Sequence, residues 1–77
     1  MPTIQIGGYK FRFYSSDLNE PPHVHVIRAE QVAKIWLQPL AVEYNRGYNK
    51  VELNRVLKLT AKNETKLLEA WHAYFDR

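Results

Sequence analysis

The sequence predicts an α+β domain, in which an antiparallel sheet of about four strands (residues 3–37) precedes two helices packed on one sheet face. Apolar side chains recur at every second position in the segments before residue 38, which is the period of a half-buried strand. From Asn49 onward they recur at spacings of three and four residues, which is typical of an amphipathic helix. Because 77 residues have room for one hydrophobic core, we expect a single domain over residues 1–77.

The segment TIQIGGYKFRFY predicts a β-hairpin at the start of the chain. Gly7 and Gly8 separate its two strands, and glycine readily adopts the positive φ angles of a two-residue hairpin turn. The second strand alternates between two faces, with Tyr9, Phe11 and Phe13 on one and Lys10, Arg12 and Tyr14 on the other.

Two more strands are predicted after the loop SSDLNEPP, at residues 23–28 (HVHVIR) and 31–37 (QVAKIWL). Pro39 ends the fourth strand, because proline cannot donate a hydrogen bond to a sheet ladder. Residues 40–49 fit either a short strand or an irregular crossing, with a turn at Gly47. Alternation places the histidines and valines of HVHV on opposite faces.

The C-terminal part predicts two helices, at about residues 50–62 and 64–76, in preference to one bent helix. Asn49 followed by Glu52 has the spacing of a capping box, and Asn63 suits either the end of the first helix or the start of the second. The apolar side chains at helical spacing are Leu53, Val56, Leu57, Leu67, Leu68, Trp71, Tyr74 and Phe75.

The sheet face opposite the helices is expected to be basic with interleaved aromatic rings. Such a face suits single-stranded RNA, because cations contact phosphates and rings stack on bases. A solvated polar face is the ordinary alternative, and a protein contact would equally explain an exposed Trp36. The side chains predicted on this face are Lys10, Arg12, Tyr14, His23, His25, Lys34 and Trp36.

His23 and His25 are the most informative candidates for chemistry. They are candidate ligands for one ion, with Asp17, Glu20 or His72 completing the shell. No complete zinc signature is present, however, so we expect neither a metal nor a cofactor. A purely structural role, with His23 packed against the preceding loop, is the simplest alternative.

The same histidines also fit acid–base catalysis by a metal-independent ribonuclease. One imidazole would accept the proton of the 2′-hydroxyl, another would protonate the leaving oxygen, and nearby cations would stabilise the phosphorane. Arg12 and Arg28 are the candidate cations, although alternation puts Arg28 on the valine face. The candidate RNA or partner contacts are Lys10, Tyr14, Lys34, Trp36 and Arg46.

Overall composition narrows the setting without deciding the function. The formal charge of +3 and the pI of about 9.3 permit RNA, DNA or an acidic protein as partner. The chain has no cysteine, as is common in a reducing cytosol, and no run of about 18 apolar residues that would span a membrane. We therefore expect a cytoplasmic protein without membrane contact.

Several blocks of the chain resemble a small bacterial family of domains of unknown function. The similar blocks are MPTI, GGYKFRFYSSD, EPPHVHV, AKIWL, NRGYN and LLEAWHAYF. Members of that family are often encoded beside a second small uncharacterised domain, as type II toxin–antitoxin pairs are. The resemblance therefore implies a partner protein encoded alongside, and no established activity.

These observations together predict a type II toxin–antitoxin component, with the toxin favoured over the antitoxin, that acts on RNA through the histidine-bearing sheet face. The alternative is a non-catalytic interaction module, either an antitoxin or a partner-binding domain, and homo-oligomerisation is compatible with both. A DNA-binding regulator is a weaker alternative, because no recognition-helix signature is present.

Overall fold

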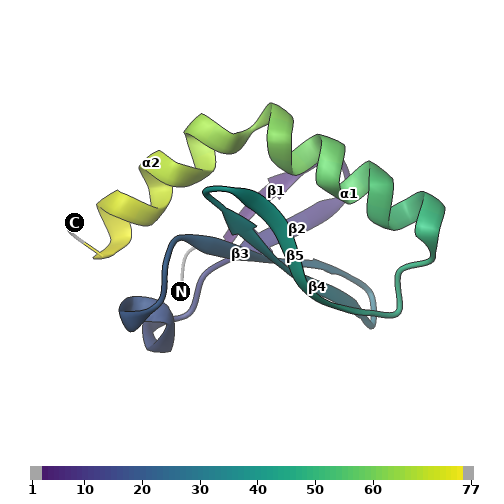
Figure 1. Cartoon of the computed structure of the whole chain (residues 1–77), viewed down its shortest axis with the longest axis horizontal. Helices are drawn as coiled ribbons and strands as arrows, with labels where there is room; N and C mark the ends of the chain where they lie inside the picture. The colour runs from purple at the N-terminus through teal and green to yellow at the C-terminus, as the bar shows by residue number, and fades with distance from the viewer. Residues whose placement is uncertain (1–2, 76–77) are drawn as a thin grey trace.

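The computed structural model describes residues 3–75, which form a five-stranded antiparallel sheet with two helices on one face (Figure 1). The strands lie side by side in chain order, and two-residue connections join each pair except the second and third strands, which residues 13–22 connect. The α+β class is therefore confirmed, with one strand more than predicted. The elements are β1 (Thr3–Ile6), β2 (Tyr9–Arg12), the 3-10 helix η1 (Ser15–Asn19), β3 (His23–Arg28), β4 (Gln31–Leu37), β5 (Leu40–Arg46), α1 (Lys50–Lys62) and α2 (Glu64–Phe75).

The first hairpin forms as predicted. Gly7 and Gly8 have φ angles of 57° and 85°, the left-handed conformation that a two-residue hairpin turn requires. The alternation in β2 also holds, because its aromatic set is buried and Lys10 is exposed. The buried set Tyr9, Phe11 and Phe13 packs beneath the helices with Val24, Val26, Ala33, Ile35, Leu37, Tyr48, Val56, Leu67 and Trp71.

The segment that the sequence left open is the edge strand β5. It pairs with β4, and the register shifts where Lys34 faces Tyr44 while Ile35 faces Val42. Glu43 is thus the extra residue of a β-bulge, which breaks the regular alternation. Most of β5 is also exposed, so its side chains lack the strong apolar pattern of an inner strand.

The two predicted helices are confirmed. The Asn49 side chain caps α1 by accepting a hydrogen bond from the Glu52 N–H at 2.8 Å. Only this half of the capping box forms, since the Glu52 carboxylate instead pairs with Arg28 at 3.2 Å. Asn63 separates α1 from α2, and the predicted end of the second helix at residue 76 lies outside the described residues.

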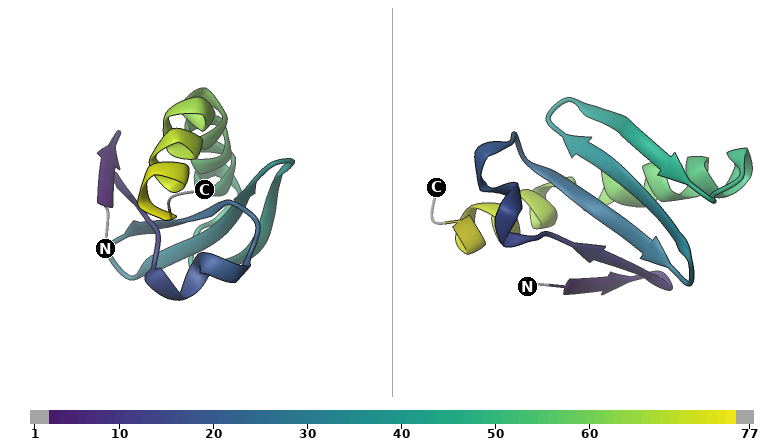
Figure 2. Two further views of the ribbon diagram at one scale, coloured as in Figure 1. Left: turned by 90° about the vertical axis from the view of Figure 1, so that its left-hand side faces the viewer. Right: turned by 90° about the horizontal axis from the view of Figure 1, so that it is seen from below.

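The predicted loop before β3 contains η1, which lies on the side of the sheet away from the helices (Figure 2). η1 crosses the end of the sheet where β3 begins. The expectation that both histidines lie on an open face was wrong, because His23 is 0% exposed and His25 only 9%. The rest of that face remains partly or fully exposed.

No helix among residues 3–75 is long and apolar enough to cross a membrane.

Candidate functional site

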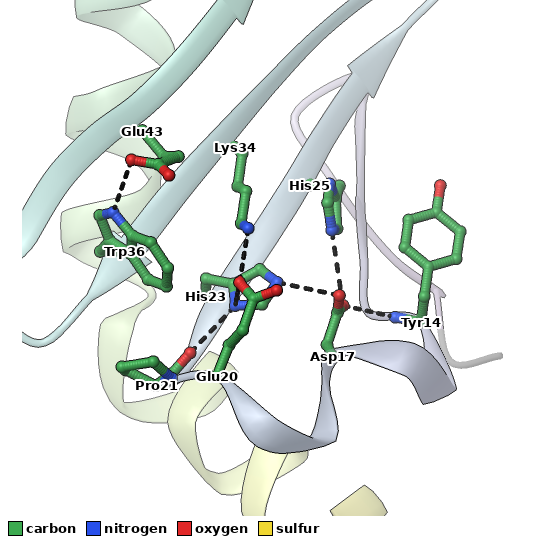
Figure 3. Close-up of polar contacts among 9 residues, drawn as sticks. All are labelled: Tyr14, Asp17, Glu20, Pro21, His23, His25, Lys34, Trp36 and Glu43. Carbon is green, nitrogen blue, oxygen red and sulfur yellow. Dashed lines mark hydrogen bonds and ion pairs between the residues drawn. The ribbon is translucent and has the colours of Figure 1, made fainter.

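The candidate site is a buried cluster of Asp17, His23 and His25 (Figure 3). β3 supplies the two histidines from alternate positions, so both rings project from the sheet face opposite the helices. η1 supplies the carboxylate, which lies against both rings and is 6% exposed. We refer to these three residues as the Asp17 cluster.

Backbone hydrogen bonds hold Asp17 in place. Its Oδ2 atom accepts the Tyr14 N–H at 2.8 Å, and its own N–H donates to the Tyr14 carbonyl at 2.9 Å. Its carbonyl accepts the Glu20 N–H at 3.0 Å, which closes the η1 turn. These hydrogen bonds fix the position of the carboxylate independently of the histidines.

The two imidazoles approach Asp17 through the same nitrogen. The Nε2 atom of His23 lies 3.2 Å from Oδ1, and the Nε2 atom of His25 lies 3.4 Å from Oδ2. Neither contact has hydrogen-bond geometry, and within residues 3–75 both buried Nε2 atoms lack a hydrogen-bond partner. Buried polar atoms usually have a partner, so two such atoms at one carboxylate require an explanation.

His23 is enclosed by aromatic rings. Its centroid lies 5.3 Å from that of Trp36 on β4 and 5.1 Å from that of Trp71 on α2. Its Nδ1 atom lies 2.9 Å from the Pro21 carbonyl oxygen. Because that oxygen can only accept, Nδ1 carries a proton in this arrangement.

His25 lies nearer the open part of the face, with the Tyr14 ring edge-on at a centroid distance of 4.7 Å. Burial lowers the pKa of His25, and the charges of His23 and Lys34 lower it further. The Asp17 carboxylate opposes that shift. The net effect favours a neutral imidazole at physiological pH.

A cross-strand row extends from His25 across the sheet. Arg12 faces His25, His25 faces Lys34, and Lys34 faces Tyr44 in the strand register. Neighbouring members of this row are separated by roughly 4.8 Å, the spacing between strands. We call these four residues the basic row.

Lys34 is the best-anchored cation of the basic row. Its Nζ atom lies 2.6 Å from Glu20 Oε1 and 4.9 Å from the Trp36 ring centroid. The hydrogen bond from Lys34 lowers the pKa of Glu20. The Trp36 indole N–H in turn points to Glu43 Oε1 at 3.4 Å.

The structure brings most, but not all, of the predicted site residues together. Lys10 and Arg46 lie in the next cross-strand row, on β2 and β5. Arg28 lies apart, because it pairs with Glu52 of α1 and stacks over the Tyr9 ring at 5.5 Å. It is therefore remote from the Asp17 cluster, as alternation along the strand predicted.

Two residues of the site were not among the predicted contacts. Asp17 was considered only as a possible metal ligand, since nothing in SSDLN shows that the loop folds back over β3. Tyr44 was not predicted, because the sequence does not distinguish a strand from an irregular segment at this position. The spacing D-x5-H-x-H and the aromatic residue in AVEYNR were the available signals.

A family model described as "Domain of unknown function (DUF4160)" matches residues 8–72 of this chain. The matched region includes the whole Asp17 cluster and the basic row. No curated protein and no solved structure matches the chain. The predicted resemblance to a family of unknown function is confirmed, and its association with toxin–antitoxin pairs stays a prediction.

Proposed function

The chain belongs to the DUF4160 family of domains of unknown function, and we propose that it binds single-stranded RNA through the sheet face opposite its helices. In this proposal RNA is the target of a toxin in a type II toxin–antitoxin pair, the role that the sequence resemblance implied. The observation that carries it is the basic row, with its cations, imidazole and aromatic ring aligned across four strands.

The chemistry of this face suits a flexible polyanion. Arg12 and Lys34 flank His25 in the basic row, and Lys10 and Arg46 repeat the positive charge one row further along. Cations on several strands of one face can contact a sugar–phosphate backbone, and partly exposed rings offer stacking surfaces for unpaired bases. The rings available on the described face are Tyr14, Trp36 and Tyr44.

The ion pair of Lys34 does not prevent such binding. The side chain of Glu20 is 42% exposed and that of Lys34 is 12% exposed, so the pair is open to solvent mainly at the carboxylate. An RNA phosphate can therefore replace the carboxylate while Lys34 keeps its position over Trp36.

The proposal concerns binding and does not extend to cleavage by the two histidines as an acid–base pair. A general acid or base must reach the proton that it transfers. His23 has no exposed surface, and the Nε2 atoms of both rings face Asp17.

The test is fluorescence anisotropy with labelled single-stranded RNA of mixed sequence. The double variant Arg12→Gln/Lys34→Gln removes two charges from the basic row, and Arg55→Gln/Lys58→Gln removes two exposed charges from α1 as a matched control. We expect the first pair to raise the Kd at least tenfold and to reduce the salt slope by about 1.4, given about 0.7 per phosphate contact on a single strand. We expect the control to change the Kd less than twofold, and equal losses in both would overturn the proposal.

A specific observation also favours a protein-binding role. Within residues 3–75 β5 pairs with β4 alone, so its other edge carries backbone groups without a strand partner among them, and its side chains are mostly exposed. An extended segment of a partner protein can add to such an edge. A Val42→Pro variant removes one backbone donor from β5, and loss of a co-expressed partner with the fold and RNA binding unchanged would favour this second role.

A further inference from the structure

We propose that Asp17, His23 and His25 bind one divalent transition-metal ion, for which Zn²⁺ is the best match. The inference goes beyond RNA binding and does not depend on it. The sequence analysis expected no metal, because no complete zinc signature is present, although Asp17 was one of the residues considered as a third ligand. Folding of η1 over β3 supplies the third.

The spacing of the ligand atoms fits a metal ion. One ligand atom from each residue can be chosen so that all lie within 4.8 Å of one another. Zinc binds imidazole nitrogen and carboxylate oxygen at about 2.0–2.2 Å, so tetrahedral neighbours are roughly 3.4 Å apart. The nitrogen–oxygen distances are 3.2 Å to Oδ1 for His23 and 3.4 Å to Oδ2 for His25, so each imidazole lies at about that separation from one of the two carboxylate oxygens.

The hydrogen bond at the far side of His23 prepares its ring for a metal. With the Nδ1 proton directed at the Pro21 carbonyl at 2.9 Å, a neutral His23 presents the lone pair of Nε2 to Asp17. A backbone carbonyl on the second nitrogen is the usual means by which proteins fix the tautomer of a metal-binding histidine. Pro21 therefore acts as the orienting group of the proposed site.

A lone pair and a carboxylate oxygen repel each other in a buried setting unless a cation lies between them. A proton on Nε2 is the simplest such cation, and it would form a hydrogen bond to the carboxylate. Both Nε2 atoms face the carboxylate here, and neither contact has hydrogen-bond geometry. One metal ion satisfies both nitrogens and the carboxylate together.

The donor set selects the kind of ion. Two imidazoles and one carboxylate suit zinc and its neighbours in the first transition row, whereas Ca²⁺ and Mg²⁺ prefer oxygen ligands throughout. Three protein ligands leave one tetrahedral position for water or another ligand. Glu20 does not fill that position in this arrangement, because its Oε1 atom lies near the Nδ1 atom of His23, at 3.9 Å.

The experiment is calorimetric titration of the chelator-treated protein with Zn²⁺, repeated with Co²⁺ while visible absorption is recorded. We expect one Zn²⁺ per chain and the intense visible bands of four-coordinate cobalt. Asp17→Asn and His25→Ala should weaken zinc binding at least about a hundredfold, since each removes a ligand. His72→Ala is the matched control, because this exposed histidine of α2 lies outside the cluster, and it should bind zinc like the wild type.

A measurement on the wild-type protein tests the site even if the variants fail to fold. In histidine-ring NMR spectra, one equivalent of Zn²⁺ should shift the Nε2 signals of His23 and His25 and leave those of His72 unchanged. The absence of stoichiometric zinc uptake, or uptake that Asp17→Asn retains and His72→Ala loses, would overturn the inference. RNA binding measured with and without zinc tests the proposed function separately.

Discussion

The two faces of β3 are both buried, but by different means. Val24 and Val26 pack under the helices in the hydrophobic core, whereas His23 and His25 are covered by η1 and neighbouring rings. An antiparallel sheet with helices on one side normally leaves its other face to water. Burial of valine contributes to stability directly, but burial of imidazole opposes folding unless a partner compensates. The first face therefore explains the fold, and the second calls for a functional explanation.

The largest effect is expected on the valine-bearing face. Phe11→Ala removes a fully buried ring and should lower the free energy of unfolding by about 3–5 kcal/mol, through lost burial and the cavity that remains. That loss is comparable with the whole stability of many small domains, so the variant should be largely unfolded by circular dichroism and urea titration. A variant that keeps the wild-type urea midpoint would show that this face is not the main source of stability.

Removal of the proposed metal is the corresponding change on the histidine-bearing face. A ligand that binds only the folded state at a free concentration of 100 times its Kd adds about 2.7 kcal/mol, and a chelator should remove that amount. Thermal unfolding of the zinc-loaded protein with and without EDTA measures the loss. Asp17→Asn should show no EDTA-dependent change in Tm. A similar change in both proteins would mean that the metal stabilises the protein by binding outside the Asp17 cluster.

Alkaline pH offers a milder test of the helix-covered face through Tyr48. Burial raises the pKa of Tyr48 to about 12, with further increases from Tyr9 and Glu52 and a decrease from Arg28. Its hydroxyl also donates to the Val26 carbonyl at 3.0 Å. A raised folded-state pKa means that the contribution is complete below the unfolded pKa of about 10 and is lost as pH rises toward about 12.

The matched variant for this test is Tyr48→Phe, which cannot ionise at that position. The free energy of unfolding of the wild type should fall relative to that of the variant by up to about 2 kcal/mol over the window from pH 10 to 12. The other tyrosines and the lysines titrate in both proteins, so the difference isolates Tyr48. Parallel curves would mean that Tyr48 is not desolvated by the core.

The same comparison explains which features the sequence predicts. Apolar periodicity in the sequence predicts which side chains form the helix-covered face. The position of a residue within its own strand or helix is enough to place its side chain on that face. β5 lacked that signal, since it lies at an exposed edge and Glu43 interrupts its alternation. Arg28 followed the strand rule and lies on the helix side.

The histidine-bearing face depends on contacts between segments, which local patterns do not contain. The candidate histidines were identified from their alternation in HVHV, but their burial requires η1 to cross the end of the sheet. Short 3-10 helices have no strong sequence period, so neither η1 nor the approach of Asp17 was predicted. The Asp17 cluster is thus a tertiary feature built from residues that appear separately as loop and strand.

The smallest expected effect on stability is that of a Lys34 substitution. The same substitution best distinguishes the basic row from the buried Asp17 cluster. Lys34→Gln removes the pair with Glu20, in which the Lys34 side chain is 12% and the Glu20 side chain 42% exposed, so the free energy of unfolding should fall by no more than about 1 kcal/mol. Affinity for single-stranded RNA should nevertheless fall about three- to tenfold, because Lys34 is a central cation of the basic row. Zinc affinity should change little, since Lys34 contributes no ligand atom to the Asp17 cluster. A variant that loses RNA binding but keeps its stability and its zinc affinity would show that the open and buried parts of this face act independently. Joint loss of RNA and zinc binding would show that they form one site.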